Sequence, residues 1–208
     1  MKAWVNFLRR YRLWLLLITL GFIIATIAIA PLEKTLGARV RLVYLHGAWV
    51  WTGKVAFGLA GLAGLGAFLF ADRRSFWSGW SLAFGRTGLI FWLTYLPLSL
   101  VVQQLNWGGI YWDEPRWRVP LAFGVAGILL QAALTLFNRP LWTAVANLVF
   151  GVALWAGLAQ LQNVLHPDSP IFGSGSQRIE AFFLVLMFLT ILLMIQVALW
   201  LNTRARYA

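Results

Sequence analysis

Residues 42–70 read LVYLHGAWVWTGKVAFGLAGLAGLGAFLF, an apolar run in which Lys54 is the single charged residue. About 20 mostly apolar residues are enough for a helix to cross the hydrocarbon core of a bilayer. Five more stretches of this kind flank it: residues 13–30, 87–105, 119–137, 141–165 and 179–201. Only short polar segments separate the six stretches. The sequence therefore predicts an all-α membrane protein, a bundle of six transmembrane helices forming one domain over residues 1–208.

The composition supports this fold class and excludes several functions. Of the 208 residues, 61% are hydrophobic and 11% are charged, and the mean hydropathy is +0.77. A soluble globule of this size needs more polar surface than these residues provide, so a water-soluble enzyme is excluded. Cysteine is absent. Disulfides, a thiolate nucleophile and covalent haem attachment through a C-x-x-C-H motif are therefore excluded as well.

The basic residues are unevenly divided between the two sides of the predicted bundle. One side carries ten of them against the single acid Asp72, and the other carries six against five acids. Because cytoplasmic loops are enriched in Lys and Arg, both termini are predicted to be cytoplasmic and the loop between the third and fourth helices external. The net charge of +11 then reflects topology and anionic lipid, not nucleic acid. The richer side has Lys2, Arg9, Arg10, Arg12, Arg73, Arg74, Arg86, Arg139, Arg204 and Arg206; the other has Lys34, Arg39, Arg41, Arg116, Arg118 and Arg178.

The chain has two histidines, His46 and His166. The predicted topology places both at the outer membrane boundary, on helices that a compact bundle can bring together. Neutral imidazole is a good iron ligand, and two imidazoles on opposed helices can hold a haem iron from both sides. The alternative is that each histidine is an interfacial side chain that reaches the lipid headgroups.

A tryptophan-rich segment is expected at the same depth, in the loop between the third and fourth helices. Residues 106–118 read NWGGIYWDEPRWR, with three Trp and one Tyr. Such a segment can present an aromatic surface to a planar ligand, and Gly108 and Gly109 allow the backbone to approach it closely. The alternative is an aromatic belt at the membrane interface.

Charged residues close this loop. Arg116 and Arg118 can bind carboxylates, such as haem propionates, through forked charge-assisted hydrogen bonds. Asp113 and Glu114 are expected to pair with these arginines or to cap the following helical turn. The loop therefore combines aromatic surface with cations suited to an acidic planar ligand.

Together these residues resemble a known family. Trp107-Gly108, Tyr111-Trp112-Asp113 and Arg116 are similar to the tryptophan-rich "WWD" signature of the haem-handling proteins of cytochrome c biogenesis. Tyr111 stands where the signature usually has Trp, and the spacing from Trp107 to Asp113 is one residue shorter. Six spans, this loop between spans three and four, and one His before span two and one before span six resemble the cytochrome c maturation haem protein C family.

The resemblance implies a function and a set of site residues. Non-covalent haem b would be presented at the outer face of a bacterial cytoplasmic membrane and passed to a periplasmic or extracellular haem chaperone or apocytochrome. An ATP-binding-cassette subunit and a small single-span subunit would be partners. The implied axial iron ligands are His46 and His166. The implied haem platform consists of Trp107, Gly108, Tyr111, Trp112 and Asp113.

No catalytic arrangement is visible in the sequence. A hydrolase or transferase needs a nucleophile and base held together, and a nucleotide hydrolase needs a phosphate-binding glycine loop; neither pattern is present. We therefore expect a haem-binding protein that is not an enzyme. Two alternatives stay open: a b-type cytochrome subunit that exchanges electrons with quinol, and a non-catalytic membrane subunit or permease-like partner of a transporter.

The second apolar stretch has two further features. Lys54 lies eight residues, or about two helical turns, beyond His46. An ionisable group within a span is usually paired or functional, so Lys54 is expected to reach a haem propionate or Glu180, or else to extend back to the outer interface. Glycines at every third position, Gly58, Gly61 and Gly64, predict close packing against another helix.

Overall fold

The computed structural model describes residues 2–162 and 171–202, and the regular elements within these residues are all helical. Each of the six α-helices is long and apolar enough to cross a membrane, which confirms the predicted number and type of spans. The helices are α1 (Lys2–Ala28), α2 (Val40–Leu69), α3 (Arg74–Trp107), α4 (Pro115–Phe137), α5 (Pro140–Ala159) and α6 (Gln177–Asn202), and a 3-10 turn, η1 (Ala71–Arg73), joins α2 to α3.

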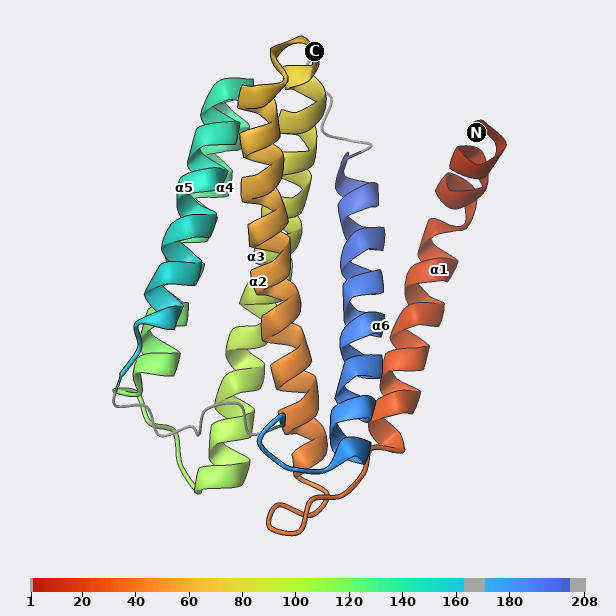
Figure 1. The fold of residues 1–208 in the computed structure, drawn as a ribbon, viewed down its shortest axis with the longest axis vertical. Coiled ribbons are helices and arrows are strands. Elements are labelled where there is room, and N and C mark those ends of the chain that lie inside the picture. Colours follow the sequence, from red (N-terminus) through yellow and green to blue (C-terminus); the bar gives the residue numbers. More distant parts are fainter. Residues whose placement is uncertain (1, 163–170, 203–208) are drawn as a thin grey trace.

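The helices form an up-and-down bundle around α2 and α3 (Figure 1). These two helices pack extensively against each other, and both also contact α5 and α6. On one flank α4 lies against α3 and α5, and on the other α1 packs mainly against α6. The start of α1 and the end of α6 share one end of the bundle. Residues 29–39 and 108–114 lie at the opposite end, which we call the loop end.

The outer surface of the bundle is strongly apolar. Large side chains are exposed along several helices, including Ile24 (67% exposed), Leu136 (84%) and Phe188 (65%). A soluble monomer rarely exposes contiguous apolar surface of this extent, whereas lipid accommodates it. The exposed surface and the six spans together describe an integral membrane protein.

The glycine repeat of α2 lies against α5, as predicted from its spacing. A methyl group on Gly61 would lie 3.5 Å from the Cα atom of Leu148. One on Gly64 would overlap the carbonyl oxygen of Ala144. The absence of side chains at these positions therefore lets the two backbones approach closely.

Helix α3 begins 13 residues before the predicted start at Thr87, so that boundary was wrong. Polar residues lower the hydropathy of its first turns, but their hydroxyl groups have partners on neighbouring helices. Ser78 Oγ donates to the carbonyl oxygen of Pro140 (3.0 Å), and Ser81 Oγ donates to that of Ala60 (2.8 Å). Arg86, predicted in a loop, lies within α3 and donates to Thr135 Oγ1 (2.9 Å). Satisfied polar groups allow the helix to continue.

The start of α4 and the end of α5 also differ from the predicted spans, whereas α4 ends at Phe137 as predicted. Helix α4 starts at Pro115, not at residue 119, because Glu114 caps its N-terminus and proline is favoured at the first helical position. Helix α5 ends at Ala159 instead of residue 165.

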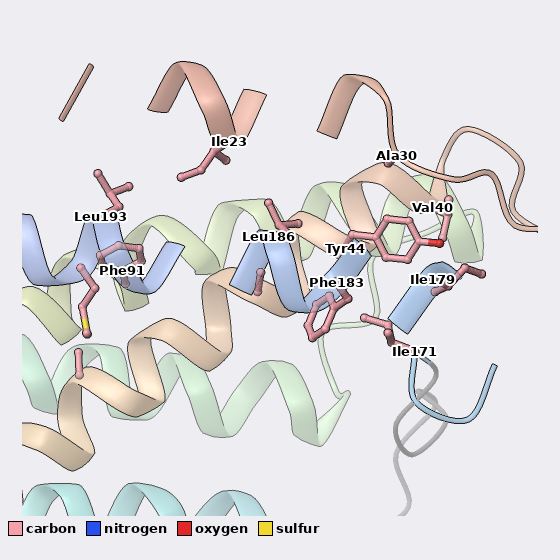
Figure 2. Close-up of a cluster of buried hydrophobic side chains, with 13 residues drawn as sticks. Ile23, Ala30, Val40, Tyr44, Phe91, Ile171, Ile179, Phe183, Leu186 and Leu193 are labelled. Atoms are coloured by element: carbon pink, nitrogen blue, oxygen red, sulfur yellow. The ribbon is translucent and has the colours of Figure 1, made fainter. Parts of the chain in front are cut away.

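A buried apolar cluster holds the loop-end part of α2 against α6 (Figure 2). Tyr44 is 1% exposed, and the centroid of its ring lies 5.2 Å from that of the Phe182 ring. Gly47 lies close to α6: a methyl group there would be 3.3 Å from Phe183 Cε2 and 3.6 Å from Ile171 Cδ1. This packing fixes the turn of α2 that carries His46.

The segment before α2 is ordered by its own polar groups. The Glu33 carboxylate accepts hydrogen bonds from the backbone amides of Leu36 (2.8 Å) and Thr35 (2.7 Å). These bonds, led by that from Leu36, hold the pKa of Glu33 below its usual value. Arg39 Nη1 donates to the carbonyl oxygen of Leu105 (3.0 Å), so the segment is also tied to the end of α3.

Candidate ligand-binding site

A cavity of about 430 Å³ lies between the helices, and its lining extends from Lys54 of α2 to Trp107 and Glu114 at the loop end. Small-molecule sites commonly have volumes of about 300–1,000 Å³ and walls that are mostly apolar with a few polar groups. The lining here has that character. Its residues are Val43, His46, Gly47, Val50, Trp51, Lys54, Trp92, Tyr95, Ser99, Val102, Gln103, Trp107, Glu114, Arg116, Pro120, Leu158, Leu161, Ile171, Phe172 and Phe183.

Helical periodicity explains why α2 and α3 supply most of this wall. The lining residues of α2 fall at positions 43, 46, 47, 50, 51 and 54, and those of α3 at 92, 95, 99, 102, 103 and 107. Separations of three or four residues place side chains on one face of a helix. Because α2 and α3 are antiparallel neighbours, these two faces enclose one space between them.

His46 lies half-buried on the cavity wall against Tyr95 of α3, a residue that no pattern in the sequence indicated. The centroids of the His46 and Tyr95 rings are 5.0 Å apart and the ring planes are inclined by 39°. Tyr95 is 4% exposed, and its hydroxyl group donates to the carbonyl oxygen of Arg116 (3.5 Å). Tyr95 thus connects the imidazole of α2 to the first turn of α4.

The tryptophan-rich loop is divided between the cavity and the outer surface. Trp107 and Arg116 line the cavity, while the remaining predicted site residues of the loop do not. Trp112 is 59% exposed. Gly108 adopts the left-handed conformation that ends α3 (φ +72°), and there is open space where its Cβ would be. The predicted platform residues outside the lining are Gly108, Tyr111, Trp112 and Asp113.

The acids of the loop form the ion pair and the helix cap that the sequence predicted for them. Arg118 pairs with Asp113 at the surface (Nη1 to Oδ1, 3.4 Å), which places this arginine outside the cavity lining. Glu114 is 4% exposed and accepts a hydrogen bond from the backbone amide of Arg116 (3.4 Å) as the N-cap of α4. The loop is held over the end of α3 because the buried Gln103 Oε1 accepts from the backbone amide of Tyr111 (3.1 Å).

Lys54 lies between two indole rings on the cavity wall. Its Nζ atom is 3.9 Å from the ring centroid of Trp51 and 4.4 Å from that of Trp155. Both distances are typical of cation–π contacts. In residues 2–162 and 171–202 no carboxylate lies within 4.0 Å of this ammonium group, so the suggested pair with Glu180 does not form there.

His166, the second predicted iron ligand, lies outside the described residues. The nearest lining residues on either side of it in the chain are Leu161 and Ile171. Among the described residues there is also no group of three or more His, Cys, Asp or Glu that could hold a metal ion by themselves.

No protein-family model, curated protein or solved structure matches this chain. The cavity itself is therefore the basis for inferring the function of the chain. Its walls offer aromatic faces, one imidazole, and two cations from different helices, Lys54 and Arg116. This combination suits a flat apolar ligand that carries both a metal and acidic groups.

Proposed function

We propose that this chain is a haem-binding membrane protein that presents haem at the outer face of the membrane for cytochrome c biogenesis. The observation that carries the proposal is the place of His46, in the wall of a cavity of about 430 Å³ near the loop end. The role consists of binding and release, with no covalent chemistry performed by the protein.

The residues of the cavity fit haem b in three respects. Porphyrin supplies four ligands to its iron, so a single imidazole such as that of His46 is enough to hold the group. The aromatic walls, including Trp92 and Trp107, match a flat apolar macrocycle. Arg116 can bind a propionate. When bound, the iron porphyrin is the cargo to be delivered, and His166 is the proposed second ligand.

The outward orientation is part of the same proposal. The end of the bundle opposite the loop end has the greater number of basic residues, which favours a cytoplasmic location for both termini. The cavity would then open toward the outer face of a bacterial cytoplasmic membrane, where a haem chaperone or apocytochrome can receive the cargo. An ATP-binding-cassette subunit and a small single-span subunit are the proposed membrane partners.

An absorption spectrum of the detergent-purified chain, with pyridine-haemochrome quantification, tests the proposal. We expect a Soret band and up to one haem b per chain after reconstitution with haemin. The absence of saturable haem binding would refute it and favour a non-catalytic membrane subunit. Haem that cycles with quinol but does not pass to a soluble acceptor would instead favour a b-type cytochrome subunit.

A further inference from the structure

Lys54 occupies a position where a charge is costly. It is the fifteenth residue of α2, about 21 Å along the helix from its start at the loop end, given a rise of about 1.5 Å per residue. Ionisable groups at such depth are rare, usually face a cavity, and commonly mark a pathway or binding site. The residues that contact Lys54 therefore indicate its function.

The contacts of Lys54 hold its cation without neutralising it. Trp51 and Trp155 present their ring faces to the ammonium group, at 3.9 and 4.4 Å. Trp155 is itself fixed because its Nε1 donates to the backbone carbonyl oxygen of Lys54 (3.1 Å). Indole faces stabilise a cation through their quadrupole but carry no net charge. No carboxylate of the described residues lies in ion-pair range, so the ammonium group of Lys54 has no counter-charge among them.

A second cation lines the same cavity. Arg116 enters it from the first turn of α4, and its charge repels that of Lys54. The carboxylate in the lining, Glu114, already caps α4 at the loop end. Charges that face an apolar space are screened poorly by their surroundings. An anionic group beside Lys54 would gain attraction to its ammonium group.

We propose that Lys54 binds a carboxylate of the cavity ligand and thereby gives the cavity its preference for acidic over neutral porphyrins. The proposal rests on the proposed haem function and extends it from iron ligation to recognition of the propionate edge. Lys54 lies on the same face of α2 as His46, so one helix presents both the iron ligand and the carboxylate-binding group.

The test compares haemin with haemin dimethyl ester, in which both carboxylates are blocked. The purified full chain is titrated with each, as the unsubstituted protein, Lys54→Met, Lys54→Arg and the control Lys34→Met, which removes a charge from an exposed loop residue. We expect the unsubstituted protein and Lys34→Met to prefer haemin. Lys54→Met should lose about tenfold of that preference, and Lys54→Arg should keep most of it. The Soret position should not change in Lys54→Met, because iron ligation is intact.

The outcomes separate this inference from the haem proposal. An unchanged preference in Lys54→Met, with haemin still bound, overturns the role of Lys54 and leaves the haem function standing. If the unsubstituted protein fails to bind haemin, the haem function is refuted.

In that case the binding of metal-free protoporphyrin IX, measured by quenching of tryptophan fluorescence, tests carboxylate recognition separately from iron. Binding that is weaker in Lys54→Met supports it, and absent or equal binding overturns it. Lys54→Gln replaces Lys54→Met if the latter does not fold.

Discussion

The imidazole ring of His46 packs against the phenol ring of Tyr95, with the centroids 5.0 Å apart and the planes inclined by 39°. The two residues come from antiparallel helices, and Tyr95 is fixed on its other sides by Trp92, at 5.3 Å between ring centroids, and by the carbonyl oxygen of Arg116. A ligand that binds through His46 therefore depends on an imidazole that packs against α3.

Tyr95 is predicted to act as a positioning residue for His46. Tyr95→Phe keeps the ring contact and loses only the hydrogen bonds of the hydroxyl group, to Ser99 and to the carbonyl oxygen of Arg116 (3.5 Å), so haem binding should remain within about twofold of the unsubstituted protein. Tyr95→Leu removes the ring, and the Soret band should broaden or shift because His46 gains rotational freedom. Titration with haemin, with the Soret position as readout, checks this. Identical spectra for Tyr95→Leu and the unsubstituted protein would contradict the role.

Substitutions on the two faces of the tryptophan-rich loop should differ in their effect on haem retention. Trp107 lines the cavity, whereas Trp112 is 59% exposed and does not. Trp107→Ala should therefore release haem faster than Trp112→Ala, as measured by transfer to excess apomyoglobin. Trp142→Ala, at an exposed tryptophan of the opposite end, serves as the control and should have no effect. Equal effects of all three would indicate a generic aromatic belt.

The packing of α2 against α5 gives a stability prediction that is independent of function. A methyl group on Gly64 would overlap the carbonyl oxygen of Ala144, so Gly64→Ala should push the helices apart and lower the free energy of unfolding by about 1–3 kcal/mol. Gly21→Ala is the matched control, because its added methyl group would have no atom of another helix within 4 Å. Thermal unfolding in detergent should show a lower midpoint for Gly64→Ala alone. A lower midpoint for Gly21→Ala alone would contradict the packing account.

Hydropathy was sufficient to find six spans because each helix carries an apolar run of membrane length. The start of α3 was missed because Ser78 and Ser81 look like loop residues in sequence, and only the fold shows that carbonyl oxygens of Pro140 and Ala60 accept their hydrogen bonds. A hydropathy average over neighbouring residues cannot represent these hydrogen bonds. Ser78 and Pro140 are 62 positions apart in the chain, and Ser81 and Ala60 are 21 positions apart.

The candidate site was predictable in part. The residue types of His46, Trp107 and Arg116 indicate ligand binding in the sequence alone, and the three residues line one cavity. The sequence gives no indication that Tyr95 belongs to the site. A single tyrosine within a span points to a binding role only when the face of α3 that lies opposite His46 is known. The spacing of the lining residues of α3 was present in the sequence, but which face of a helix meets its neighbour depends on tertiary packing.

Membrane topology gives a fourth prediction. The start of α1 and the end of α6 share one end of the bundle, and the greater number of basic residues predicts that this end is cytoplasmic. A phosphatase reporter that is active only outside the cytoplasm should be inactive after Ala208 and active when inserted at Gly109 in the tryptophan-rich loop. The reverse pattern would place the cavity on the cytoplasmic side and contradict the proposed direction of haem delivery.

The most direct test of the central claim is the haem spectrum of His46→Ala beside that of the unsubstituted chain, with His166→Ala measured in parallel. The account predicts that the unsubstituted protein binds haemin saturably and that each substitution weakens binding or shifts the Soret band, with imidazole added to the solution partly restoring the His46→Ala spectrum. Full haem occupancy with an unchanged spectrum in His46→Ala would show that the cavity does not ligate iron through this residue, and would contradict the proposed function.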